Sequence, residues 1–214
     1  MRGELSPALF IPQAEQTSLL SELTSWVMDR VISRLARLRN SCIQLPVTVN
    51  VSSIDFAREG FADALELKMV RARLPVSLLG IECLETERII ENPAAMHGLE
   101  MLKLRGFGVS LDDFGTGYSN INYLRRMPLD VIKLDRSLIS EISSDTASRI
   151  IARSIIAMLK DLDYTVLAEG VEDAETGTAL TEYGCDQAQG FFYSRPLPES
   201  ELDGWLSWKL RGQC

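Results

Sequence analysis

Histidine is almost absent from this sequence. The single residue, His97, lies in the segment Asn92-Pro93-Ala94-Ala95-Met96-His97, at the start of a predicted helix. A lone helical histidine is more often a surface or packing residue than a catalyst, so histidine-driven catalysis is disfavoured. Any hydrolysis is expected to depend on carboxylates and metal ions instead.

Cysteines are also few, and their spacing is not that of metal ligands. Cys42, Cys83, Cys185 and Cys214 show neither CxxC spacing nor the density of a disulfide framework, which predicts reduced thiols and argues against structural zinc. No apolar run approaches the roughly 20 residues of a membrane span, and the first residues lack the apolar core of a signal peptide. We therefore expect a cytoplasmic protein that does not bind a membrane.

The charge balance excludes another class of partner. The chain has 22 basic and 30 acidic residues, a formal net charge of −8, which would repel a polyanion over most of the surface. Long DNA or RNA is therefore not an expected partner. With 214 residues, of which 46% are hydrophobic, the chain can bury a substantial core, and we expect one globular domain over residues 1–214.

Strand-like and helix-like patterns alternate along the chain. Short apolar runs predict strands at 47–51, 77–84, 107–111, 131–134, 165–168 and 187–192. Helical periodicity or helix start and stop signals occur at 13–38, 52–71, 93–104, 118–126, 146–162, 174–183 and 199–206. This alternation predicts an α/β fold of the TIM-type (β/α) barrel class, with parallel strands that are buried on both faces of the sheet. Six strands are too few for the eight of a complete barrel, so we expect an incomplete one.

Polar or charged residues lie at or near the carboxyl end of nearly every predicted strand. In (β/α) barrels the reactive groups lie at the carboxyl ends of the strands, and those positions hold Asn50, Glu82, Glu85, Asp112, Asp113, Lys133, Asp135, Glu169, Glu172 and Gln189. Carboxylates that converge on one rim repel one another unless cations neutralise them. Adjacent aspartates such as Asp112 and Asp113 can bridge two metal ions. Ligands that offer only oxygen suit Mg²⁺ or Mn²⁺.

Simpler interpretations exist for each of these residues. An Asp-Asp pair alone is usually a solvated turn or a helix cap, and the glycine-rich segment that follows could be only a tight loop. Lys133 could pair with Asp135 at a sheet edge, and Gln189 could hydrogen-bond to the backbone. The functional interpretation is favoured because nearly all of these residues fall where strands end.

Several longer motifs, in a fixed order, resemble the EAL domain family. They are Phe10 to Glu15, Asn50-Val51-Ser52, Asp112 to Tyr118, Tyr123 to Pro128, Lys133 to Arg136, Ala168 to Glu172, Gln189 to Phe192 and Arg195 to Pro198. This resemblance implies a metal-dependent phosphodiesterase that opens cyclic-di-GMP to the linear dinucleotide pGpG. It covers essentially residues 3 to 205.

The resemblance also implies individual roles. Asn50, Glu82 and Asp112 would bind one metal, and Asp112 would bridge to a second metal bound by Asp113 and Glu169. Lys133 would contact the attacking water, with Glu169 and Glu172 also assigned to catalysis. Gln189, Asp135 and Arg195 would contact the substrate. Glu85 would anchor the loop from Gly115 to Ser119, which in this family couples metal binding to dimer contacts.

One departure from the family pattern affects the expected activity. The Glu-Ala-Leu sequence that names the family, and that lies on its first barrel strand, is absent from these 214 residues. The fold is therefore expected to lack that strand, the first metal site to be weakened, and the unpaired edge to favour a homodimer or strand exchange. Three hypotheses follow: a phosphodiesterase of impaired activity, a non-catalytic cyclic-di-GMP-binding or protein-interaction module, and a gene fragment without selected activity.

Overall fold

The computed structural model describes residues 6–14, 17, 19–41, 43–84, 87–116 and 124–211. The chain forms two compact units, residues 1–133 and 134–214, and each is described here by itself. Among the described residues, no helix combines the length and the apolar character needed to cross a membrane. The single domain expected from the sequence stays a prediction.

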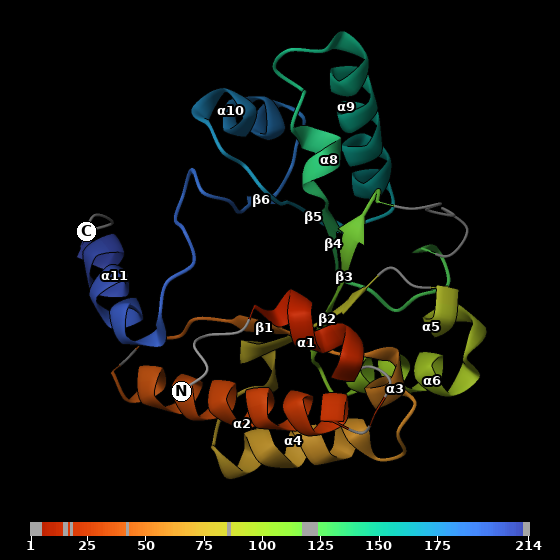
Figure 1. Cartoon of the computed structure of the whole chain (residues 1–214), viewed down its shortest axis with the longest axis vertical. Coiled ribbons are helices and arrows are strands. Elements are labelled where there is room, and N and C mark those ends of the chain that lie inside the picture. The colour runs from red at the N-terminus through yellow and green to blue at the C-terminus, as the bar shows by residue number, and fades with distance from the viewer. Residues whose placement is uncertain are drawn as a thin grey trace. The chain divides into compact units, whose positions relative to one another are not determined.

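Unit 1 alternates helices with parallel strands (Figure 1). Its elements are α1 (Pro7–Ala14), α2 (Leu19–Asn40), β1 (Val47–Asn50), α3 (Ser53–Phe56), α4 (Phe61–Arg71), the 3₁₀ helix η1 (Val76–Leu78), β2 (Leu79–Leu84), α5 (Glu87–Glu91), α6 (Pro93–Leu104), β3 (Gly108–Phe114) and β4 (Val131–Leu134), whose last residue begins unit 2. The pairs β1–β2 and β2–β3 are both parallel. The carboxyl ends of these strands therefore lie on one edge of the sheet.

Local sequence explains how α6 forms and what it covers. The Asn92 side chain accepts hydrogen bonds from the N–H groups of Ala94 and Ala95, and Pro93 occupies the first turn, where its missing N–H costs nothing. The helix buries Leu99 and Leu102 and packs against β3. Covered on this face, β3 buries residues through most of its length.

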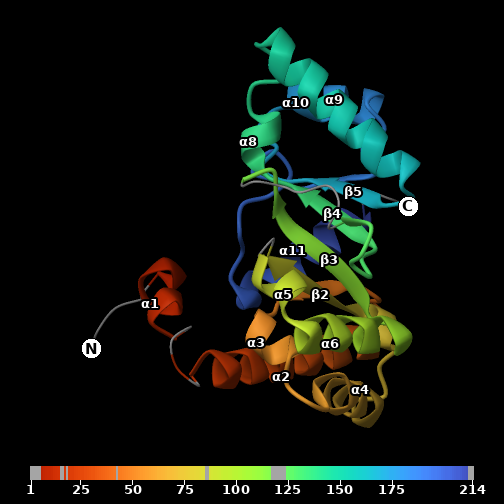
Figure 2. The ribbon, with the colours of Figure 1, turned by 90° about the vertical axis from the view of Figure 1, so that its right-hand side faces the viewer.

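Unit 2 contains α8 (Arg136–Ile139), α9 (Thr146–Asp161), β5 (Thr165–Ala168), α10 (Ala174–Glu182), β6 (Gln187–Ala188) and α11 (Glu199–Arg211) (Figure 2). The Glu169 N–H donates to the Leu134 carbonyl at 3.0 Å, so the chain leaving β5 is held to the end of β4. The strands β5 and β6 pair in parallel. Helix α9 packs against both α8 and β5.

The predicted strands are confirmed at five sites, and the sixth is shorter than expected. The expected strand over 187–192 ends at Ala188 because Gly190 adopts a φ of 154° and its backbone lies against Val171. A Cβ at Gly190 would lie 2.2 Å from the Val171 carbonyl oxygen. The single helix expected over 52–71 is also wrong: it divides into α3 and α4 at Gly60, whose φ is 74°. Most of the helix expected over 118–126 lies outside the described residues.

The same lysine–aspartate arrangement fixes the amino ends of two strands, once in each unit. In unit 1, Asp130 accepts from the Val109 N–H at 2.9 Å and pairs with Lys103, near the end of α6. In unit 2, Asp186 accepts from the Val166 N–H at 2.7 Å and pairs with Lys160, near the end of α9, at 2.7 Å. Each aspartate therefore joins the start of one strand to the helix before it. This end of a barrel strand serves stability.

Asp186→Asn is expected to make the protein less stable at neutral pH but not in acid. Burial acts to raise the pKa of Asp186, but the hydrogen bonds from Lys160 and the Val166 N–H outweigh it and hold the pKa below its ordinary value. Its stabilising effect is thus present above the unfolded pKa, near 4, and is lost as the pH falls through the lower folded pKa. Urea unfolding should show a loss of about 1 kcal/mol at pH 7. The loss should disappear near pH 2, and a difference that is equal at both pH values would contradict this role.

Candidate functional site

The carboxyl ends of β1, β2 and β3 bring three of the predicted metal ligands to one edge of unit 1. Asn50 and Glu82 are register partners on β1 and β2, and Asp112 stands opposite Leu84 on β2 and β3. Glu82 and Asp112 are both buried, whereas Asn50 is exposed at the end of β1. The simpler interpretation of Asp112 as part of a solvated turn is therefore wrong, because this residue lies within a strand.

Lys133 joins two of these carboxylates. Its Nζ atom lies 2.9 Å from Asp112 Oδ1 and 3.1 Å from Glu82 Oε1. The three side chains are only 6%, 12% and 10% exposed, for Lys133, Asp112 and Glu82 in that order. A buried charge is costly unless it is paired, so the contact with Lys133 offsets the cost of burying the two carboxylates. Asp113, the next residue along β3, brings a third carboxylate to this end of the strand.

Asp113 has an unusual backbone conformation. Its φ is 54°, in the left-handed region that aspartate and asparagine tolerate better than most residues. Its carbonyl accepts hydrogen bonds from the N–H of Thr116 at 3.3 Å and from the Thr116 hydroxyl at 3.0 Å. This turn directs the chain away from β3 immediately after the pair of aspartates. Strained backbone of this kind occurs most often at functional sites.

Cys83 lies on β2 directly after Glu82, but its thiol is unreactive. Burial, with smaller contributions from the negative charges of Asp112 and Glu82, raises the pKa of its thiol to about 12. The thiol donates to the Ser110 carbonyl at 3.3 Å. It therefore stays protonated at neutral pH and is neither a nucleophile nor a soft metal ligand.

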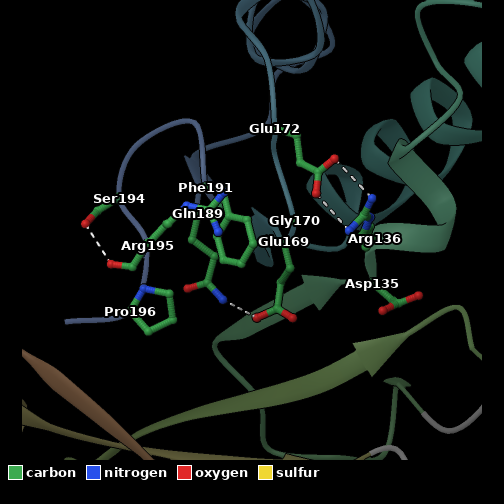
Figure 3. A pocket seen from close by; sticks show the side chains of 11 residues that line it. Asp135, Arg136, Glu169, Gly170, Glu172, Gln189, Phe191, Ser194, Arg195 and Pro196 are labelled. Carbon is green, nitrogen blue, oxygen red and sulfur yellow. Dashed lines mark hydrogen bonds and ion pairs between the residues drawn. The ribbon is translucent and has the colours of Figure 1, made fainter. Parts of the chain in front are cut away.

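In unit 2, five of the predicted residues line a cavity of about 470 Å³ (Figure 3). Its walls are formed by Asp135, Arg136, Glu169, Gly170, Glu172, Gln189, Gly190, Phe191, Ser194, Arg195 and Pro196. The Gln189 amide donates to Glu169 Oε1 at 2.5 Å. Gln189 therefore orients the Glu169 carboxylate with its side chain, and the simpler interpretation, a bond to backbone alone, is incomplete.

Two cations and two further acids complete the charges of this cavity. Arg136 forms a bidentate pair with Glu172, with distances of 2.8 and 3.1 Å. The guanidinium carbon of Arg195 lies 4.7 Å from the centre of the Phe191 ring. Asp135 caps α8 by accepting from the Ser137 N–H at 2.9 Å. Partial burial acts to raise the pKa of Asp135, but hydrogen bonds from Ser137 and Arg136 and the charge of Arg136 lower it below its ordinary value.

The predicted site residues thus fall into two groups. Glu82, Asp112 and Lys133 contact one another in unit 1, and Asp135, Glu169, Glu172, Gln189 and Arg195 line the cavity in unit 2. Glu85 lies outside the described residues. Arg136 and Phe191 also line the cavity, although the sequence motifs assign neither residue an individual role. Arg136 could have been noticed because it directly follows Asp135 in a motif of the resemblance.

A model of the EAL domain matches residues 1–196 of the chain. The chain belongs to the EAL domain family. Two curated relatives come from Pseudomonas aeruginosa and Escherichia coli. MucR, named a bifunctional diguanylate cyclase/cyclic di-GMP phosphodiesterase, is 35% identical over 94% of this chain and 29% of its own length. PdeR, named a cyclic di-GMP phosphodiesterase, is 33% identical over 98% of this chain and 32% of its own length. The chain therefore spans about a third of these relatives.

Solved EAL structures agree with this assignment. The PaMucR phosphodiesterase in complex with c-di-GMP has a TM-score of 0.85 and 34% identity, covering 94% of this chain and 82% of that one. The parallel strands and intervening helices of this EAL domain are those of an incomplete (β/α) barrel. The fold class expected from the sequence is confirmed.

Lys133→Met is expected to lower the free energy of unfolding by about 3 kcal/mol at pH 7, because it leaves the buried carboxylates of Glu82 and Asp112 without their cation. Lys103→Met is the matched control. Lys103 is 30% exposed and pairs with Asp130 at the other end of the strands, so its loss should cost less than about 1 kcal/mol. Urea unfolding of both variants measures the difference. Equal losses would show that the buried cluster has no special electrostatic role.

Proposed function

We propose that this EAL domain hydrolyses cyclic-di-GMP to pGpG in a reaction that requires Mg²⁺ or Mn²⁺. The observation that carries the proposal is the buried contact of Lys133 with Glu82 and Asp112, in a chain whose relatives are named cyclic di-GMP phosphodiesterases. The cavity of unit 2, with a phenylalanine ring and two arginines, supports a nucleotide as the ligand.

The residues at the strand ends of unit 1 fit a divalent metal ion. The carboxylates of Glu82, Asp112 and Asp113 and the amide of Asn50 offer only oxygen or weakly binding nitrogen ligands, which suits Mg²⁺ or Mn²⁺ better than Zn²⁺. The carboxylates of Glu82 and Asp112 lie against the single charge of Lys133, and a divalent ion would neutralise the remaining negative charge. In this proposal Asp112 would help to hold both ions, and Asp113 and Glu169 would help to hold the second one. When bound, the ions lower the pKa of a water molecule and neutralise charge on the phosphodiester.

The other residues would position groups and move protons. Lys133 is a buried donor whose ammonium group can hydrogen-bond to the attacking water and offset the negative charge that develops during the reaction. Gln189 holds Glu169 in one orientation through the 2.5 Å hydrogen bond. Glu172, Asp135 and Arg195 lie in the wall of the same cavity, where they would contact the substrate or support its catalytic groups.

Other sequence expectations also remain predictions, among them a weakened first metal site, cytoplasmic location, and a homodimer or strand exchange. Sedimentation of the purified chain at micromolar concentration tests the last of these directly, because a monomeric mass would contradict it.

Asp113→Asn is expected to lower the rate of pGpG formation by about 100-fold or more. Loss of a residue that only supports a metal ligand already lowers activity by up to about 100-fold, and Asp113 is proposed to bind the metal itself. Asparagine tolerates the left-handed backbone of this position, so the fold should be retained. The measurement is the incubation of the purified chain with cyclic-di-GMP and Mn²⁺, followed by separation of the products. Asp161→Asn, at the end of α9, is a control with the same chemical change.

The control should match the original chain in rate. If the original chain forms no more pGpG than Asp113→Asn, the catalytic proposal is wrong. Calorimetry with cyclic-di-GMP and Ca²⁺ then tests the non-catalytic binding module expected as the alternative, since heat of binding without turnover would support it.

A further inference from the structure

We propose that Arg136 binds a phosphate group of the nucleotide ligand, and that Glu172 occupies Arg136 until that ligand arrives. The inference rests on the proposed function in taking a phosphodiester as the ligand. It adds a binding residue and an internal competitor for it. Both side chains line the cavity of unit 2 (Figure 3).

The geometry of the pair is that of anion recognition. Arg136 directs two guanidinium nitrogens at the two oxygens of one carboxylate, with distances of 2.8 Å to Glu172 Oε1 and 3.1 Å to Glu172 Oε2. A phosphate presents pairs of oxygens to the same planar fork, which is why arginine binds both groups in this way. The Glu172 carboxylate thus stands where phosphate oxygens would bind.

The exposure of the pair makes it exchangeable. Arg136 is 57% exposed and Glu172 is 47% exposed, and ion pairs in such surroundings are weak because water solvates both partners. The cluster of Lys133, Glu82 and Asp112 (the Lys133 cluster) differs, because its side chains are at most 12% exposed. An incoming phosphate can therefore replace Glu172 on Arg136 with little cost. Release would also free the Glu172 carboxylate for its predicted role.

The backbone of Gly170 keeps the Arg136 stem beside the cavity. A Cβ atom at Gly170 would lie 2.8 Å from both Cβ and Cγ of Arg136, and the φ of 73° also favours glycine. The loop after β5 therefore packs closely on the aliphatic part of Arg136. The guanidinium group can change its partner while the stem stays in place.

The charges in the cavity wall explain why an anion needs Arg136. The wall contains three carboxylates, on Asp135, Glu169 and Glu172, and the guanidinium groups of Arg136 and Arg195. Arg195 has one face covered by the Phe191 ring. Arg136 presents its edge, with two donors, to an anion already. A phosphate without this contact would meet mainly negative charge.

The test is a double-mutant cycle with guanosine monophosphate as the probe and no metal ion present. Binding to the full chain is followed by NMR of the arginine Nε–H signals. Arg136→Ala should weaken binding at least about tenfold, because a charge-assisted hydrogen bond is lost. Glu172→Gln should tighten binding by about two- to fivefold, because the competing carboxylate is gone.

The direction in which Glu172→Gln changes the affinity for guanosine monophosphate distinguishes this proposal from an ion pair with only a structural role. Glu175→Gln, in the first turn of α10, removes one negative charge nearby and should leave the affinity within about twofold. In the Arg136→Ala background, Glu172→Gln should give no gain. A gain that persists without Arg136, or weaker binding by Glu172→Gln alone, would overturn the proposal.

The source of the phosphate is tested in the same titration with inorganic phosphate. Tighter binding of guanosine monophosphate supports a nucleotide ligand, and equal binding overturns that part of the proposal. Because no hydrolysis is measured, a chain that fails to form pGpG would contradict the proposed function without changing the outcome of this cycle. A normal rate of hydrolysis in Arg136→Ala would contradict the inference alone.

Discussion

The ammonium group of Lys133 lies between two buried carboxylates, and the site in unit 1 depends on this contact. Strand register brings Glu82 beside Asn50 and sets Asp112 opposite Leu84. Three strands therefore place oxygen-bearing side chains at one edge of the sheet. Without Lys133 the buried carboxylates would repel one another and destabilise the fold. The lysine therefore compensates two carboxylates in a place that is nearly closed to water. Converging carboxylates are the ligands that a hard divalent cation prefers.

Much of this edge could be predicted from the sequence because strand periodicity and strand ends are local properties. Short apolar runs located five strands, and the polar residues at their carboxyl ends located Asn50, Asp112 and Glu169. The partner of Lys133 could not be predicted in the same way. Asp135 is close to it in the sequence, but Glu82 and Asp112 lie on other strands. Pairing across a sheet depends on register, and register is set by packing over the whole sheet.

The failures of prediction have similar physical causes. Gly60 divides the helix expected over 52–71 because its φ of 74° interrupts the helical backbone. The strand expected after Gln187 ends early because Gly190 packs directly on the backbone of Val171. The apolar residues that follow suggested a strand, yet Phe191 faces a cavity instead. Apolar character alone does not tell whether an aromatic ring fills a core or lines a binding site.

Burial determines which ion pairs in this protein are permanent and which can exchange. Lys133, Glu82 and Asp112 are nearly closed to water. Breaking their contacts would leave an unpaired charge in surroundings that solvate charge poorly, so their geometry is fixed. The pair of Arg136 and Glu172 is about half exposed, so water solvates either partner when the pair opens, and the cost of opening is small. The proposed hydrolysis of a nucleotide would need both kinds of contact. Reacting groups must be held within a fraction of an ångström, whereas contacts to the ligand must form and break in every catalytic cycle.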